Sequence, residues 1–201
     1  MKNEVSNSEM KGPLGELFDQ CSGENGRQRF EEFKLWLKGV VNGLLAYVTT
    51  VRAPAIKRFV ASDVWSQVGV NRDGMRIGFL GKNFLEQFGN IVEENVPETE
   101  LEVSCLQRYA DVIEIAGAIS REKRSVKASQ IYQLVCISEA GGHSGLLNNG
   151  WANLFLAYGI DGNIWLVYVY RLSDGWDFDA NPLGRPYRWS DGDRVFSRKS
   201  H

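Results

Sequence analysis

The densest group of side chains that could bind a metal ion lies in SDGWDFDANPLG, residues 173–184. An EF-hand calcium loop places oxygen ligands at positions 1, 3 and 5, a glycine at position 6 and a glutamate at position 12. Counted from Asp177, the first three positions hold suitable ligands. Pro182 and Arg188 stand where the glycine and the glutamate belong. We therefore expect no metal ion in this segment.

The same segment has the alternation of a half-buried β-strand. Trp176 and Phe178 fall on one side of such a strand, and Asp177 and Asp179 fall on the other. Antiparallel strands with one face on the core and one face toward water show this pattern. We predict that the two aromatic residues face the core and that the two carboxylates face solvent or an arginine.

Evidence for catalytic chemistry elsewhere is sparse. His143 lies beside Ser144 in the segment GGHSG, where a histidine could act as a general base. No nucleophile elbow surrounds this serine, so we favour an exposed loop histidine. The three cysteines have no zinc-site spacing, and we expect no cofactor. A small hydrolase-type enzyme that uses carboxylates and His143 remains an alternative.

An irregular loop near the C-terminus carries residue types that anchor protein interfaces. The segment PLGRPYRWSDG, residues 182–192, contains Arg185, Tyr187, Arg188 and Trp189. We interpret these four residues as a candidate binding surface for another protein, or for a sugar if Asp191 or Asp193 supplies polar contacts. The alternative is ordinary loop packing, in which Trp189 is tucked over a sheet.

Composition limits the classes of partner. The chain has 201 residues, 43% of them hydrophobic, and a formal net charge of −2, so it has no long-range field for nucleic acid. A weak single-stranded nucleic-acid binder is a further alternative, although aspartates are interleaved with the C-terminal arginines. The most membrane-like run, residues 35–51, contains Lys38 and Asn42, so we favour a buried helix there. Without an N-terminal apolar segment, we expect a cytoplasmic protein.

The periodicity of apolar residues predicts an α+β fold. We expect a flexible tail, then a mainly helical N-terminal part with one β-hairpin, then a helix followed by an antiparallel β-meander of three to four strands. The predicted regions are residues 1–27 for the tail, 28–120 for the helical part with its hairpin at 64–80, and 125–201 for the rest. Within the helical part, apolar residues at helical spacing predict a helix that begins near residue 30 and further helices at 82–95 and 98–120. Residues 125–140 fit a helix or a strand, and we favour a helix that Gly141 ends. The turn sequence Asp161-Gly162-Asn163 predicts a hairpin within the meander.

The C-terminal part of the chain, between a third and a half of its length, resembles the ending of an unnamed group of short uncharacterised bacterial proteins. The resemblance rests on NGWANLFLAYGIDGNIWLVYVYRLSDGWDFDA followed by RWSDGDRVFSR. It implies a β-meander and a bacterial source, and it transfers no functional residues. From the residues themselves we expect a non-catalytic macromolecular interaction module.

Overall fold

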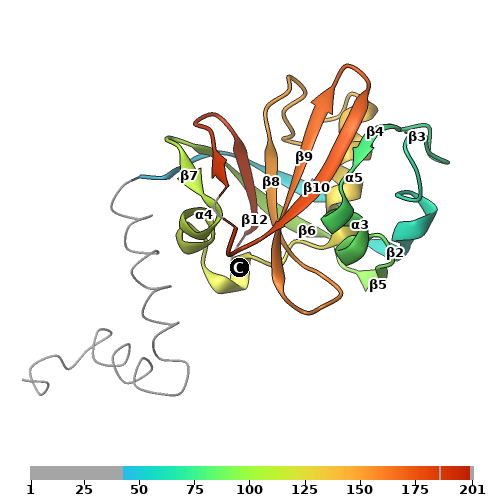
Figure 1. The fold of residues 1–201 in the computed structure, drawn as a ribbon, viewed down its shortest axis with the longest axis horizontal. Coiled ribbons are helices and arrows are strands. Elements are labelled where there is room, and N and C mark those ends of the chain that lie inside the picture. The colour runs from blue at the N-terminus through green and yellow to red at the C-terminus, as the bar shows by residue number, and fades with distance from the viewer. Residues whose placement is uncertain (1–42, 186, 200–201) are drawn as a thin grey trace, which may run out of the picture.

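The computed structural model describes residues 43–185 and 187–199. Their main element is one eight-stranded mixed β-sheet (Figure 1). Its strands are β1 (Leu45–Ala53), β3 (Gly69–Val70), β4 (Arg76–Leu80), β6 (Thr99–Leu106), β8 (Asn153–Tyr158), β9 (Ile164–Leu172), β10 (Gly175–Pro182) and β12 (Arg194–Arg198). They lie in the order β1-β6-β12-β8-β9-β10-β4-β3.

Two small sheets and several helices complete this part of the chain. The small sheets pair β2 (Ile56–Val60) with β5 (Val92–Val96), and β7 (Ala110–Asp111) with β11 (Arg188–Trp189). The α-helices are α3 (Lys82–Phe88), α4 (Val112–Ala118) and α5 (Ala128–Glu139), and the 3₁₀ helices are η1 (Ala61–Asp63) and η2 (Arg121–Lys123).

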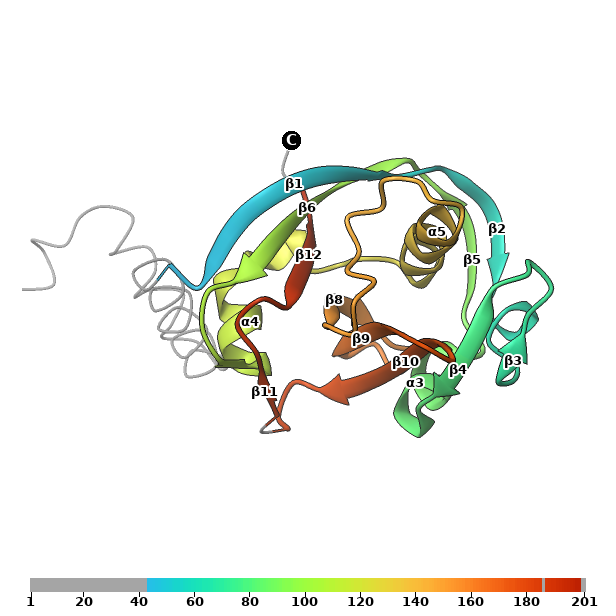
Figure 2. The ribbon, with the colours of Figure 1, turned by 90° about the horizontal axis from the view of Figure 1, so that it is seen from above.

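The large sheet is strongly curved and wraps around α5 (Figure 2). Register shifts interrupt the pairing of β1 with β6 near Tyr47 and the pairing of β10 with β4 near Trp176. Such irregularities bend a strand and increase its twist, which helps a sheet to curl. The N-terminus of α5 is fixed by Glu93 of β5, whose carboxylate accepts hydrogen bonds from the backbone N–H groups of Ala128 and Ser129.

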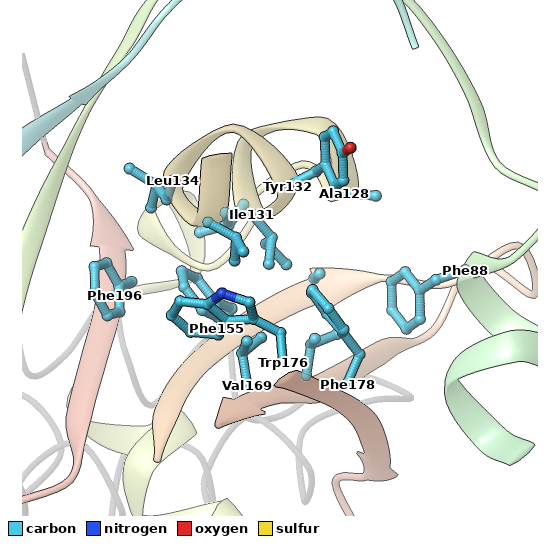
Figure 3. Packing of buried hydrophobic residues seen from close by; sticks show 14 of the residues in the cluster. Phe88, Ala128, Ile131, Tyr132, Leu134, Phe155, Val169, Trp176, Phe178 and Phe196 are labelled. Carbon is cyan, nitrogen blue, oxygen red and sulfur yellow. The ribbon is translucent and has the colours of Figure 1, made fainter. Parts of the chain in front are cut away.

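The concave side of the sheet holds the larger core. Phe155, Val169, Trp176 and Phe178 point from β8, β9 and β10 toward Ile131 and its neighbours on α5 (Figure 3). This cluster also contains Val51 of β1 and Phe196 of β12, so strands from both ends of the described chain contribute to it. The alternation in β10 is as predicted, because Trp176 and Phe178 are fully buried while Asp177 and Asp179 are only half-buried. The expectation that both carboxylates face solvent or an arginine is wrong, since Asp179 accepts a hydrogen bond from Tyr168 and Oδ1 of Asp177 is buried.

A second core covers part of the convex side of the sheet. Leu154 and Leu156 of β8 and Leu166 of β9 pack there against Ile115 of α4 and Trp189 of β11. Helix α4 begins with a capping box, in which Asp111 accepts a hydrogen bond from the backbone N–H of Glu114 and Glu114 accepts one in return. The sheet is therefore covered by a helix on each face, but on the convex face only in part.

The predicted helical N-terminal part is wrong. Residues 45–106 form six strands and only one α-helix, α3. The helix expected from about residue 30 onward is wrong for Leu45–Ala53, which form strand β1. Val48, Thr49 and Thr50 of this strand are β-branched, and such residues favour strands. Gly43 precedes this strand with a φ of 55°, a value that favours glycine. The predicted tail and the first part of that expected helix lie outside the described residues.

Two other helices were predicted too long. The segment expected as a helix at 98–120 forms strand β6 first, and its helix α4 begins only at Val112. In TELEVSCL, the apolar residues Leu101 and Val103 fit the two-residue spacing of a strand as well as one face of a helix. Pairing with β1 and β12 makes this segment a strand. The helix predicted at 82–95 ends at Phe88, and strand β5 begins at Val92.

Other predictions are confirmed. Residues 128–139 are a helix, and β3 pairs antiparallel with β4 within the predicted hairpin. β8, β9 and β10 form the expected antiparallel meander. The fourth predicted strand, β12, exists but does not extend the meander, since it pairs antiparallel with β6 and parallel with β8. The meander is thus the centre of a mixed sheet.

Truncation of Phe178 tests the core. Phe178 is fully buried and its ring lies 5.4 Å from Trp65 and 5.5 Å from Phe84, centroid to centroid. Phe178→Ala should lower the free energy of unfolding by about 3–5 kcal/mol. The matched control Val70→Ala removes a side chain that is 64% exposed and should change stability by less than about 0.5 kcal/mol. Equal effects in urea denaturation would contradict the assigned core.

Candidate functional site

The convex face of β4, β9 and β10 carries aromatic and acidic side chains in adjacent rows. In the strand register, Asp177 lies between Phe79 and Tyr170, and Asp179 lies opposite Tyr168. Directly opposed residues share one face of a sheet. Together with the neighbouring loop residue Tyr187, we call this set the tyrosine–aspartate surface; its members are Phe79, Tyr168, Tyr170, Asp177, Asp179 and Tyr187.

Asp177 is held at this surface at an energetic cost. Its Oδ1 atom is buried and accepts no hydrogen bond from the described residues. A β-carbon added to Gly78 would stand 2.7 Å from this oxygen, so the glycine leaves room for the carboxylate. Desolvation and the nearby charge of Asp174 raise the pKa of Asp177. Within the described chain, no basic side chain forms a salt bridge with Asp174, Asp177 or Asp179.

Tyr168 is a hydrogen-bond donor on this surface, and both Tyr168 and Tyr170 are partly buried. The hydroxyl of Tyr168 donates a hydrogen bond of 2.7 Å to Oδ2 of Asp179. Burial raises the pKa of Tyr168, and this hydrogen bond raises it further. Burial also raises the pKa of Tyr170. Both rings therefore stay uncharged at neutral pH and offer aromatic faces beside the carboxylates.

Trp189 is a packing residue that supports the loop. It is 2% exposed and belongs to the convex core. Its ring lies 4.8 Å from Tyr168 and 4.7 Å from Tyr187, centroid to centroid. Of the two alternatives for Trp189, the structure therefore supports packing over the sheet. Tyr187 packs at a tilt against this buried ring, yet 47% of it remains exposed.

The other two predicted loop residues, Arg185 and Arg188, are exposed. Arg185 donates a long hydrogen bond to Oδ1 of Asn181, at 3.4 Å. Arg188 lies opposite Asp111 in the pairing of β11 with β7. The structure thus brings Arg185, Tyr187 and Arg188 to one loop at the edge of the tyrosine–aspartate surface. Asp193, considered for sugar binding, is buried and accepts hydrogen bonds from the backbone of Ala152 and Ser190.

His143 and Ser144 are not arranged as a catalytic pair. His143 is exposed in its loop, and Ser144 is buried with its hydroxyl accepting a hydrogen bond from the backbone of Leu146. Among the described residues, no carboxylate forms a hydrogen bond or salt bridge with His143. As a general base, His143 therefore has no nucleophile that it could activate.

Tyr132 and Cys136 of α5 lie near polar groups as a catalytic nucleophile would, but both side chains are protonated, which favours a structural role. The hydroxyl of Tyr132 donates to Asp73 at 2.5 Å and accepts from Asn71 at 3.0 Å. Cys136 lies one turn further along the helix. Burial raises the pKa of both Tyr132 and Cys136. The thiol is therefore protonated at neutral pH, which removes its nucleophilic form.

The described residues contain neither a cluster of metal-binding side chains nor a membrane-spanning helix. No group of three or more His, Cys, Asp or Glu side chains there could hold a metal ion. None of the helices in that part of the chain is long and apolar enough to cross a membrane.

Sequence reasoning found the loop and the carboxylates but missed three aromatic members of the surface. Tyr168, Tyr170 and Phe79 were not among the residues predicted from the sequence to form a binding site. The spacing of Leu166, Tyr168 and Tyr170 indicates a shared face, but only the strand register shows that this face is the one with the aspartates. Phe79 is turned outward by the irregular pairing of β4 with β10.

Comparison with known proteins gave no match: no family model, no curated protein and no solved structure is significantly similar to this chain.

Replacement of Trp189 distinguishes packing from binding. Trp189→Ala should lower the free energy of unfolding by about 3–5 kcal/mol, because it removes a buried ring between two tyrosines. Tyr187→Ala should cost much less, about 1 kcal/mol, because half of its surface is already in water. Thermal or urea denaturation measures both variants. A Trp189→Ala protein as stable as the wild type would show that this residue does not pack as described.

The pH dependence of stability tests the environment of Asp177. The pKa of Asp177 is higher in the folded protein than in the unfolded chain, so the ionised carboxylate destabilises the fold and the protonated form does not. This loss of stability is absent at low pH and grows as pH rises through the folded pKa. Asp177→Asn should therefore raise the melting temperature at pH 7 by about 1–2 °C, a small effect because solvent screens a half-exposed group. At a pH of about 3, below the ordinary pKa of aspartate, the two proteins should melt together. A lower melting temperature for the variant at pH 7 would contradict this assignment.

Proposed function

We propose that this protein is a non-catalytic interaction module that binds a partner protein through the tyrosine–aspartate surface and its flanking loop. The observation that carries the proposal is the unfavourable position of Asp177. Its carboxylate is partly desolvated, has a carboxylate neighbour in Asp174 and lacks a basic partner in the described chain. Groups that cost stability are concentrated at functional sites, where they are retained for binding or chemistry.

The chemistry of the surface favours a basic segment of the partner. A lysine or arginine side chain placed over Asp177 and Asp179 would supply the missing opposite charge. Its aliphatic stem and its cationic head would both find aromatic rings, since Phe79 is 49% exposed beside Asp177 and Tyr187 is 47% exposed at the loop. The charge of the surface and its exposed rings thus support the same kind of contact.

The loop arginines add positive charge at the edge of the tyrosine–aspartate surface. Arg185 and Arg188 are exposed there, and Tyr187 lies between them in the chain. We propose that they contact polar or acidic groups of the partner beside the basic segment. Arginine and tyrosine are typical anchors of protein interfaces, which supports a role for all three residues.

A cytoplasmic location is part of the proposal. Cys105 and Cys136 are free thiols in the described chain, as is usual in a reducing compartment. Binding of nucleic acid receives less support, because basic residues near the C-terminus have acidic partners. Arg171 is paired with Glu139, and Lys199 is paired with Glu100.

Capture of partners from a bacterial lysate tests the proposal when it is combined with zero-length carboxylate-to-amine cross-linking. The wild-type protein should retain a partner whose lysines cross-link to Asp177 or Asp179. Asp177→Asn and Tyr187→Ala should each weaken binding of that purified partner by about tenfold or more, and binding should weaken with added salt.

Glu98→Gln is the matched control, because Glu98 is an exposed carboxylate outside the surface that is paired with Arg52. It should leave the affinity unchanged, and all variants should keep a cooperative thermal transition. Equal binding by the wild type and Asp177→Asn, or cross-links that avoid this face, would overturn the proposed function.

A further inference from the structure

The centre of the tyrosine–aspartate surface is a carboxylate between two aromatic rings. In the strand register, Asp177 of β10 lies opposite Tyr170 of β9 on one side and Phe79 of β4 on the other. Asp179 and Tyr168 form the next opposed pair of β10 and β9. Negative charge and aromatic rings are thus adjacent here, and sites that bind organic cations combine these two features.

The rings are inclined to one another and are partly open to solvent. Tyr168 and Tyr170 lie 5.9 Å apart, centroid to centroid, with 75° between their planes. Phe79 is 49% exposed, and both tyrosines are half-buried. Burial raises the pKa of Tyr170, and nearby negative charges that include Asp177 and Asp179 raise it further, so this side chain lies in the field of the carboxylates. A cation beside these rings would therefore be attracted by both kinds of group.

The carboxylates have negative charge but few oxygens that are free to accept hydrogen bonds. In Asp179, Oδ2 accepts from the hydroxyl of Tyr168 and Oδ1 accepts from the backbone N–H of Ala180, each at 2.7 Å. In Asp177, Oδ1 is buried. Among the described residues, Oδ2 of Asp177 is therefore the one oxygen of this pair that is accessible and has no hydrogen bond. Asp174 adds charge nearby but is exposed, so water competes for its oxygens.

This shortage of acceptors distinguishes between kinds of cation. An unmodified lysine ammonium has three N–H donors, which lose hydrogen bonds to water when the group is covered by the surface. An arginine is held best by both oxygens of one carboxylate, and neither Asp177 nor Asp179 has both oxygens free. A fully methylated ammonium keeps its charge, has no donor to satisfy and is bound well by aromatic rings.

We propose that the basic group recognised by this surface is a trimethylated lysine of the partner protein. Its trimethylammonium head would lie over Asp177 in contact with Phe79 and Tyr170, and its aliphatic stem would lie along the neighbouring rings. This assignment rests on the proposed function, because it names the side chain that the partner brings to the surface. Cross-links to Asp177 then come from unmodified lysines beside it in the same basic segment, since a trimethylated amine cannot form an amide.

Small probes separate charge from shape in NMR titrations of the full-length protein. Choline carries a trimethylammonium group, ethanolamine carries a primary ammonium on the same alcohol, and 3,3-dimethylbutan-1-ol has the shape of choline without its charge. Choline should shift the ring resonances of Tyr168 and Tyr170 and should bind about fivefold more tightly than the other two. No shift at millimolar choline, or equal binding of choline and either other probe, would overturn the proposal.

Replacement of single residues locates the site. Phe79→Leu removes a ring and keeps an apolar side chain, and Asp177→Asn removes the charge between the rings. Each should weaken choline binding by about threefold or more. Tyr47→Leu is the matched control, since Tyr47 is an exposed ring on β1, which lies at the far end of the strand order from β4. It should bind choline like the wild type. Wild-type affinity in Phe79→Leu or in Asp177→Asn would contradict the assigned site.

Matched peptides and phosphatidylcholine vesicles test the source of the trimethylammonium group. A lysine-rich peptide with one trimethylated lysine should bind about threefold more tightly than the same peptide unmodified, and Asp177→Asn should reduce this preference. Retention on the vesicles without a preference between the peptides would assign the site to choline lipids and overturn the proposal. Equal affinity for the two peptides would also overturn it, while the contact with a basic segment would stand. The proposed function itself fails by a different result, namely partner capture that Asp177→Asn leaves unchanged.

Discussion

Packing of α5 into the concave face of the curved sheet determines where every other group lies. Because Trp176, Phe178 and Val169 face α5, the residues between them on β9 and β10 must face the convex side. Helix α4 and strand β11 cover only part of that side. The rest is the row of tyrosines and aspartates that we propose as the binding surface. One packing contact thus fixes both the core and the candidate site.

The parts of this structure that could be predicted from sequence are those with a single dominant pattern. In β10 the aromatic and acidic residues alternate without exception from Trp176 to Asp179, so the strand and both of its faces were predicted. The turn at Asp161-Gly162-Asn163 fixed the hairpin of β8 and β9 in the same way. Helix α5 was predicted because its apolar residues repeat at helical spacing and Gly141 follows it.

The wrong predictions arose where apolar residues fit both the helical and the strand spacing. In such segments, pairing with strands distant in the sequence determines which structure forms. In β6, Leu101 and Val103 match a strand, yet the wider set from Leu101 to Ala116 also matches a helix. Pairing with both β1 and β12 gives this segment hydrogen-bonded neighbours on either side, which no local pattern reveals. The outward aromatic residues were missed for a related reason, since a tyrosine such as Tyr168 suits a core and a surface equally well.

The claim that Asp177 is retained for a basic partner is tested most directly by its pKa, measured by NMR in the free protein and in the complex. In the free protein the account predicts a pKa above the ordinary value of 3.8, owing to desolvation and the charge of Asp174. Binding of a basic segment should lower that pKa, because a nearby cation favours the ionised carboxylate. An ordinary or lowered pKa in the free protein, or no change on binding, would contradict the account.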